Sequence, residues 1–177
     1  NIRNQSDVGG GGLLDIGCYC VSSSRWICGR EPERVIGLFD KDPSFGTDRL
    51  ASGILDFGNG LQASFTCSTQ VAPYQRINIL GTHGRVEIDI PFNAPPDRPC
   101  RVSLYPGTHS DQGRFEPAES KVLDIDICDQ YTLQGEAISL AILNDEPVPY
   151  GLEDAVGNMR TLQALRQSNE SSAWIVP

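Results

Sequence analysis

The chain has 177 residues, of which 39% are hydrophobic and 21% are charged, a composition typical of a globular protein with its own core. Its 23 acidic and 14 basic residues give a net charge of -9, which argues against binding to nucleic acid. No segment approaches the roughly 20 consecutive apolar residues of a membrane-spanning helix. We therefore expect neither a nucleic acid nor a membrane among its partners.

The first predicted helix follows four consecutive glycines at 9–12 and spans about residues 13–28. At 100° per residue, its apolar side chains gather in one broad arc, which we expect to face the core. Gly29 then provides a favourable C-terminal stop. The opposite side of the helix carries Asp15, Tyr19, Ser22 and Trp26.

A β-rich region follows this helix. Residues 48–57 and 61–69 are two strand-like runs joined by Gly58-Asn59-Gly60, which is a strong signal for a hairpin turn. The second run alternates apolar and polar side chains, as a half-buried strand does. The other predicted strands span 33–41, 76–80, 85–90, 101–105 and 121–127.

Two predicted helices complete the chain. The first spans about 130–143, is capped by Asp129 and carries apolar residues on both sides, so we expect it to be well buried. The second spans about 152–168. Strands grouped together without βαβ alternation predict one α+β domain over 1–177, with an open, mainly antiparallel sheet and helices packed on one face.

Asp15 and Tyr19 are the candidate catalytic residues. They lie four residues apart and therefore project from neighbouring positions of one helix face. A phenol can donate or relay a proton, and a carboxylate can accept a hydrogen bond from a hydroxylated substrate. A structural interpretation stays open, in which Tyr19 packs against a sheet or loop and Asp15 caps the first helical turn.

The candidate substrate-binding residues lie on either side of this pair. Glycines let the backbone come close to a ligand or another domain, and a helix start offers unpaired N–H groups. No strand leads into the glycine run, so it lacks the context of a dinucleotide-binding fingerprint, and we expect no cofactor-binding residue in this chain. The candidates are Gly10, Gly11, Gly12 and Arg25.

The six cysteines lie mostly among apolar neighbours, where a free thiol behaves as a small hydrophobic side chain. They include no Cys-x-x-Cys pair, and His83 and His109 are remote in sequence, so we expect no metal site. Reduced thiols predict a cytoplasmic location. The even number of cysteines leaves open a secreted carbohydrate-binding module held by disulfides.

Five segments of the chain are informative when taken in order: GGGGLLDIGCYCV, LDFGNGLQASFTCS, INILGTHGRVEID, QYTLQGEAISLAI and LEDAVGNMRTLQALRQS. Together they resemble the C-terminal domain of the glucose–fructose oxidoreductase/inositol dehydrogenase (Gfo/Idh/MocA) family. The resemblance spans nearly the whole chain, and the glycine–aspartate–tyrosine motif is its most specific part.

The resemblance implies a protein of two domains. In the family, an N-terminal Rossmann domain binds NAD or NADP and carries a catalytic lysine in a Glu-Lys-Pro motif. The C-terminal domain shapes the substrate site and forms homo-oligomers through its open sheet. The family's motif aspartate falls on Asp15, and a position that holds histidine or tyrosine falls on Tyr19. The tyrosine version is similar to glucose–fructose oxidoreductases and to dihydrodiol and xylose dehydrogenases, in which the tyrosine handles the proton of the reacting oxygen.

The sequence departs from this pattern by omission, since it has no Rossmann domain and no Glu-Lys-Pro motif, and neither Lys41 nor Lys121 lies near the motif. We therefore expect the substrate-binding and oligomerisation domain of an NAD(P)-dependent oxidoreductase that acts on a sugar, cyclitol or related polyol, inactive by itself. The alternative is a non-catalytic binding or assembly domain with the same fold. The catalytic assignment requires that Tyr19 is exposed, because a tyrosine buried in this chain's own core could not reach a substrate.

Overall fold

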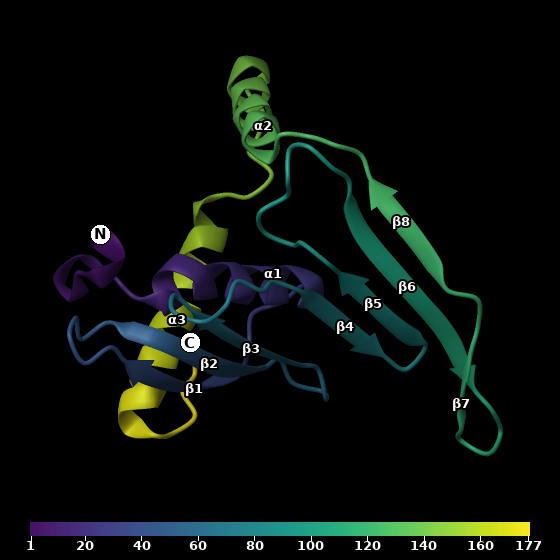
Figure 1. The fold of residues 1–177 in the computed structure, drawn as a ribbon, viewed down its shortest axis with the longest axis horizontal. Coiled ribbons are helices and arrows are strands. Elements are labelled where there is room, and N and C mark those ends of the chain that lie inside the picture. The colour runs from purple at the N-terminus through teal and green to yellow at the C-terminus, as the bar shows by residue number, and fades with distance from the viewer. The chain divides into compact units, whose positions relative to one another are not determined.

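The computed structural model describes all 177 residues and divides into two compact units. Unit 1 comprises residues 1–72 and 150–177, and unit 2 comprises residues 73–149. Every strand pair is antiparallel, which confirms the α+β class, but the strands form two sheets, one in each unit (Figure 1). That residues 1–177 act as one functional domain stays a prediction.

Unit 1 contains a three-stranded sheet in the order β1-β2-β3 and two long helices. The predicted hairpin between β2 and β3 is confirmed, with Gly58, Asn59 and Gly60 all at positive φ. The predicted first helix is also confirmed, although its first turn is π-helical. The elements are η1 (Ile2–Asn4), η2 (Ser6–Val8), η3 (Leu13–Gly17), α1 (Cys18–Cys28), β1 (Arg34–Lys41), β2 (Asp48–Asp56), β3 (Gln62–Ser68) and α3 (Leu152–Ser171).

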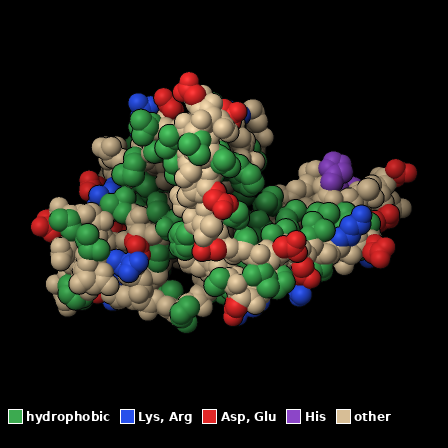
Figure 2. All heavy atoms as spheres, turned by 90° about the horizontal axis from the view of Figure 1, so that it is seen from above, with side chains coloured by type: hydrophobic (Ala, Val, Ile, Leu, Met, Phe, Trp, Pro, Cys, Tyr) green, Lys and Arg blue, Asp and Glu red, His purple; other side chains and the backbone are tan.

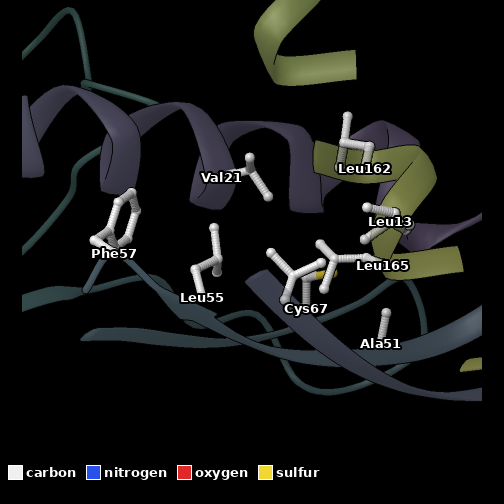
Figure 3. Close-up of a cluster of buried hydrophobic side chains, with 10 residues drawn as sticks. Leu13, Val21, Ala51, Leu55, Phe57, Cys67, Leu162 and Leu165 are labelled. Carbon is white, nitrogen blue, oxygen red and sulfur yellow. The ribbon is translucent and has the colours of Figure 1, made fainter. Parts of the chain in front are cut away.

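The hydrophobic core of unit 1 lies between one face of this sheet and the helical layer of η3, α1 and α3 (Figure 3). Because side chains alternate along a strand, β2 buries Ala51 and Leu55 on this face and turns Ser52 and Ile54 the other way. The prediction of helices on one face of an antiparallel sheet is therefore correct for unit 1. The buried hydrophobic residues are Leu13, Val21, Val35, Ala51, Leu55, Phe57, Cys67, Leu162, Ala164 and Leu165.

The outer edge of β1 is closed by α3 and the C-terminal residues. The N–H of Gly37 donates to Ser168 Oγ at 3.0 Å, and the N–H of Phe39 donates to Asn169 Oδ1 at 2.7 Å. Val35 forms a further antiparallel bridge with Ile175. Since an open strand edge invites pairing with another chain, this closure removes the β1 edge as a place for such pairing.

Unit 2 contains a five-stranded antiparallel sheet and one helix. Strand β6 is longer than the predicted strand at 101–105 and pairs with β7, which was not among the predicted strands. Strands β4 and β5 correspond to the predicted strands at 76–80 and 85–90, and they pair with each other as a hairpin. The elements are β4 (Ile77–Gly81), β5 (Gly84–Ile88), β6 (Cys100–His109), β7 (Phe115–Pro117), β8 (Lys121–Ile125) and α2 (Gln130–Asn144).

Helix α2 begins as predicted, because the Asp129 carboxylate accepts hydrogen bonds from the N–H groups of Tyr131 and Thr132. The prediction that α2 is well buried is wrong, since Ala141 is its one buried residue. A helix that is apolar all round needs neighbours on every side, and this chain does not supply them. The exposed hydrophobic side chains of α2 include Leu133, Ile138, Leu140, Ile142 and Leu143. Figure 2 shows that hydrophobic side chains form a large part of one surface of the molecule. None of the helices combines the length and hydropathy required to cross a membrane.

The core predicts a sharp difference between two leucines of α3. Leu165 is completely buried against the sheet, whereas Leu152 is 81% exposed. We expect Leu165→Ala to lower the free energy of unfolding by about 2–5 kcal/mol, because it removes apolar contacts and leaves a cavity. The matched control Leu152→Ala should change it by less than about 0.5 kcal/mol. Urea unfolding followed by circular dichroism measures both, and equal effects would contradict the described core.

Candidate active site

The glycine run and a strand together build the start of the first helix. The carboxylate of Asp48, the first residue of β2, accepts a hydrogen bond from the N–H of Leu13 at 2.6 Å. Gly11 has a φ of +123°, and a Cβ at this position would collide with the Asp48 carboxylate. The first N–H groups of a helix lack partners within the helix, so Asp48 acts as a cap supplied from another element.

Gly10 allows a second close approach, that of the N-terminal turn η1. Its N–H donates to the carbonyl of Gln5 at 2.8 Å, and a Cβ on Gly10 would lie 2.6 Å from the carbonyl oxygens of Arg3 and Gln5. Gly10, Gly11 and Gly12 are all buried. These three glycines thus have packing partners within the chain, and their predicted contact with a substrate stays a prediction.

Asp15 and Tyr19 lie on the outward side of the helix formed by η3 and α1. Tyr19 is 54% exposed and Trp26 is 67% exposed, so the predicted exposure of this face is confirmed and neither ring is buried in the core of this chain. The Asp15 carboxylate is partly exposed and binds Arg3, with 2.5 Å between Arg3 Nε and Asp15 Oδ2. The structure therefore brings Asp15 and Tyr19 together with a third polar residue.

Arg3 was not among the residues singled out from the sequence. Its pKa is raised, chiefly by the hydrogen bond to Asp15 and by the negative charge of that carboxylate, with a smaller electrostatic contribution from Tyr19. Arg3 lies outside every periodic pattern, and it reaches Asp15 only because η1 lies against Gly10. No local pattern in the sequence predicts the contact between Arg3 and Asp15.

Arg25, the fourth candidate for substrate binding, lies elsewhere. Its side chain is only 6% exposed and forms ion pairs with Glu31 at 2.5 Å and Asp154 at 3.0 Å. Because of this pairing the pKa of Glu31 is lowered and that of Arg25 is raised. The guanidinium thus joins α1 to α3, and its own chain occupies the donors that a substrate would need.

Cys20 of α1 and Cys67 of β3 are poor nucleophiles. Burial raises the pKa of Cys20 to about 11 and that of Cys67 to about 12, so both remain protonated thiols at neutral pH. All six cysteines are free in the structure. No group of three or more His, Cys, Asp or Glu side chains is arranged to hold a metal ion. The chemistry available on the exposed face is therefore that of a phenol, a carboxylate and a guanidinium.

Comparison with known proteins gives a family for this arrangement. Residues 1–87, which include the glycine run, Asp15 and Tyr19, match a family model described as the GFO/IDH/MocA C-terminal domain. An uncharacterized oxidoreductase of Rhizobium meliloti, ORF334, is 38% identical over 174 residues, which are 98% of this chain and 51% of that protein. A D-xylose 1-dehydrogenase (NADP(+)) of Haloferax volcanii is 30% identical over 180 residues, 99% of this chain and 50% of that protein.

Solved structures share the fold. A 3-ketoreductase from Actinomadura kijaniata, KijD10, in complex with NADP and TDP-benzene superposes with a TM-score of 0.81 at 23% identity, covering 95% of this chain and 49% of that one. The chain spans about half the length of the curated relatives that it matches. The shared architecture is that of the C-terminal half of these oxidoreductases.

Because Asp48 caps the start of the helix, replacing it should have a large effect on the free energy of unfolding. We expect Asp48→Ala to lower the free energy of unfolding by about 1–3 kcal/mol, because it leaves the N–H of Leu13 buried without a partner. The control Asp40→Ala breaks an exposed ion pair with Arg49 in the same sheet and should cost less than about 1 kcal/mol. Urea unfolding measures both, and an Asp48→Ala protein as stable as the wild type would contradict the cap.

Proposed function

The chain belongs to the GFO/IDH/MocA family, and on this premise we propose that it is the substrate-binding and oligomerisation domain of an NAD(P)-dependent oxidoreductase acting on a sugar, cyclitol or related polyol. One observation carries the proposal. Asp15 and Tyr19 project side by side from an exposed helix face, within the segment that matches the family model. A relative named as a D-xylose dehydrogenase supports the choice of a polyhydroxylated substrate.

In this proposal Tyr19 exchanges the proton of the reacting substrate hydroxyl through its phenol, which lies in reach of solvent and of a bound molecule. Asp15 accepts a hydrogen bond from a substrate hydroxyl and so orients it. The backbone of Gly10, Gly11 and Gly12 forms the nearby wall. Arg25 is left out of the substrate contacts, because Glu31 and Asp154 occupy its guanidinium.

The residues of this chain do not fit a dinucleotide. The glycine run is buried beneath Asp48 and η1, and no strand leads into it, so no open helix start remains for a pyrophosphate. We propose that NAD or NADP binds to a Rossmann domain in the remainder of the protein, and that this chain by itself is inactive. A cytoplasmic location is in keeping with six free cysteines.

Replacement of the phenol tests the catalytic proposal. In the full-length protein, Tyr19→Phe should lower kcat/KM by about 10²–10⁴-fold, because the group that exchanges the proton is lost. Reduction of NAD or NADP, followed at 340 nm with D-xylose, D-glucose, myo-inositol and glycerol, measures the loss. Tyr74→Phe, at an 81% exposed position of unit 2, is the matched control and should leave activity unchanged.

Undiminished turnover by Tyr19→Phe would remove Tyr19 from the reaction. A full-length protein that binds such a sugar but reduces neither cofactor would favour the non-catalytic alternative.

The outer face of the β1-β2-β3 sheet is the proposed surface for homo-oligomerisation. Leu38, which is 75% exposed, and Ile54 project from this face beside small hydroxyl side chains such as Ser52 and Thr66. They border a shallow hollow of about 610 Å³ on the sheet. The β1 edge is already closed by the chain itself, so a second copy would not extend the sheet at that edge, and in this proposal it packs against the outer face.

A charge placed on this face tests the assembly. Leu38→Asp in the full-length protein should shift the species observed by analytical ultracentrifugation toward the monomer, because it would bury an unpaired carboxylate in the interface. Phe45→Asp, an exposed position in the β1–β2 connection outside the hollow, is the control and should leave the assembly intact. A wild-type monomer, or a Leu38→Asp oligomer of unchanged size, would contradict the proposed surface.

A further inference from the structure

The Arg3 guanidinium is tied to Asp15 by one of its nitrogens only. Nε lies 2.5 Å from Asp15 Oδ2, and the structure gives Asp15 Oδ1 no hydrogen-bond partner. The Asp15 side chain is 30% exposed, so the carboxylate is not enclosed by the chain. One oxygen of the carboxylate is thus held by the protein while the other is left for a ligand.

Two contacts fix the place from which Arg3 reaches Asp15. The N–H of Arg3 donates to the side chain of Asn1 at 3.1 Å, which begins the turn η1. The N–H of Gly10 donates to the Gln5 carbonyl at 2.8 Å, which holds the end of the same turn against the glycine run. Because a Cβ at Gly10 would collide with this turn, the glycine is what permits Arg3 to lie beside the helix start.

The ion pair also sets the charge around Tyr19. Asp15 lies one helical turn before Tyr19, so an uncompensated carboxylate would oppose the formation of negative charge on the reacting oxygen. Arg3 cancels this charge. Since Arg25 is likewise neutralised by Glu31 and Asp154, neither arginine is left to bind a phosphate or a carboxylate.

We propose that Arg3 is a positioning residue of the Asp15–Tyr19 site, which orients the Asp15 carboxylate so that Oδ1 accepts a hydrogen bond from a hydroxyl of an uncharged polyol. The inference rests on the proposed function and adds to it a residue and the charge of the substrate. Arg3 acts through Asp15, and the two side chains therefore have to behave as one unit in mutational tests.

A double-mutant cycle in the full-length protein tests the proposal, with D-xylose and NADP as the probes. We expect Arg3→Gln to lower kcat/KM by roughly 10²-fold, because the misplaced Asp15 no longer aligns the substrate hydroxyl. Asp15→Asn should cause a similar or larger loss, and the double variant should lose no more than Asp15→Asn alone. A residue that only stabilises the fold would instead give multiplicative losses together with a lower melting temperature.

Arg49→Gln is the matched control. It removes an exposed arginine of unit 1 whose Nε binds Asp40 at 2.6 Å in the same manner, so it should leave kcat/KM unchanged. The charge of the substrate is tested by comparing the binding of D-xylose with that of the anion D-xylonate. We expect D-xylonate to bind poorly to the wild type and no better to Arg3→Gln.

The outcomes separate the two proposals. The role of Arg3 would be overturned by full activity of Arg3→Gln. It would also be overturned if the losses of Arg3→Gln and Asp15→Asn multiplied in the double variant. In either case a loss of activity in Tyr19→Phe would still support the proposed function. Full activity of Tyr19→Phe and Asp15→Asn would overturn the proposed function, and with it this inference. A wild type that oxidises none of the polyols would have the same meaning.

Discussion

The hydrogen bond between the Leu13 N–H and the Asp48 carboxylate is the constraint on which the candidate site depends. It joins the start of the helix to the start of β2, across 35 residues of sequence. Gly11 permits it, because no residue with a side chain could occupy that position without meeting the carboxylate. Once the helix start is fixed to the sheet, the helical repeat directs Val21 into the core and Asp15 and Tyr19 away from it.

The same arrangement explains why the outward face can carry polar groups that are not committed to the core. Helix α3 holds α1 from the other side, through the buried guanidinium of Arg25, which binds Asp154, and through its own leucines in the core. On the outward face of α1, Tyr19 is 54% exposed and Trp26 is 67% exposed. The core contacts and the candidate catalytic residues therefore lie on opposite sides of one short helix.

Local patterns in the sequence were sufficient for most of the secondary structure. The hairpin at Gly58-Asn59-Gly60 depends on backbone conformation at adjacent residues, and the Asp129 cap on a contact within one turn, so both could be predicted. Asp15 and Tyr19 could be found for the same reason, since residues four apart share a helix face. The exposure of α2 could not be predicted. Apolar residues on both sides of a helix indicate that it needs packing neighbours, but they do not tell whether the same chain supplies those neighbours.

The residues that the sequence did not reveal are those whose partners are distant or aperiodic. Asp48 begins an ordinary strand, and Arg3 lies in a short turn, yet both are bound to the first helix because glycines let the backbones approach. A run of glycines before a helix can be interpreted as a ligand-binding site. Here the Asp48 carboxylate and the turn η1 occupy the space in which a ligand would bind. In this unit the glycines therefore assemble the start of the helix that carries Asp15 and Tyr19.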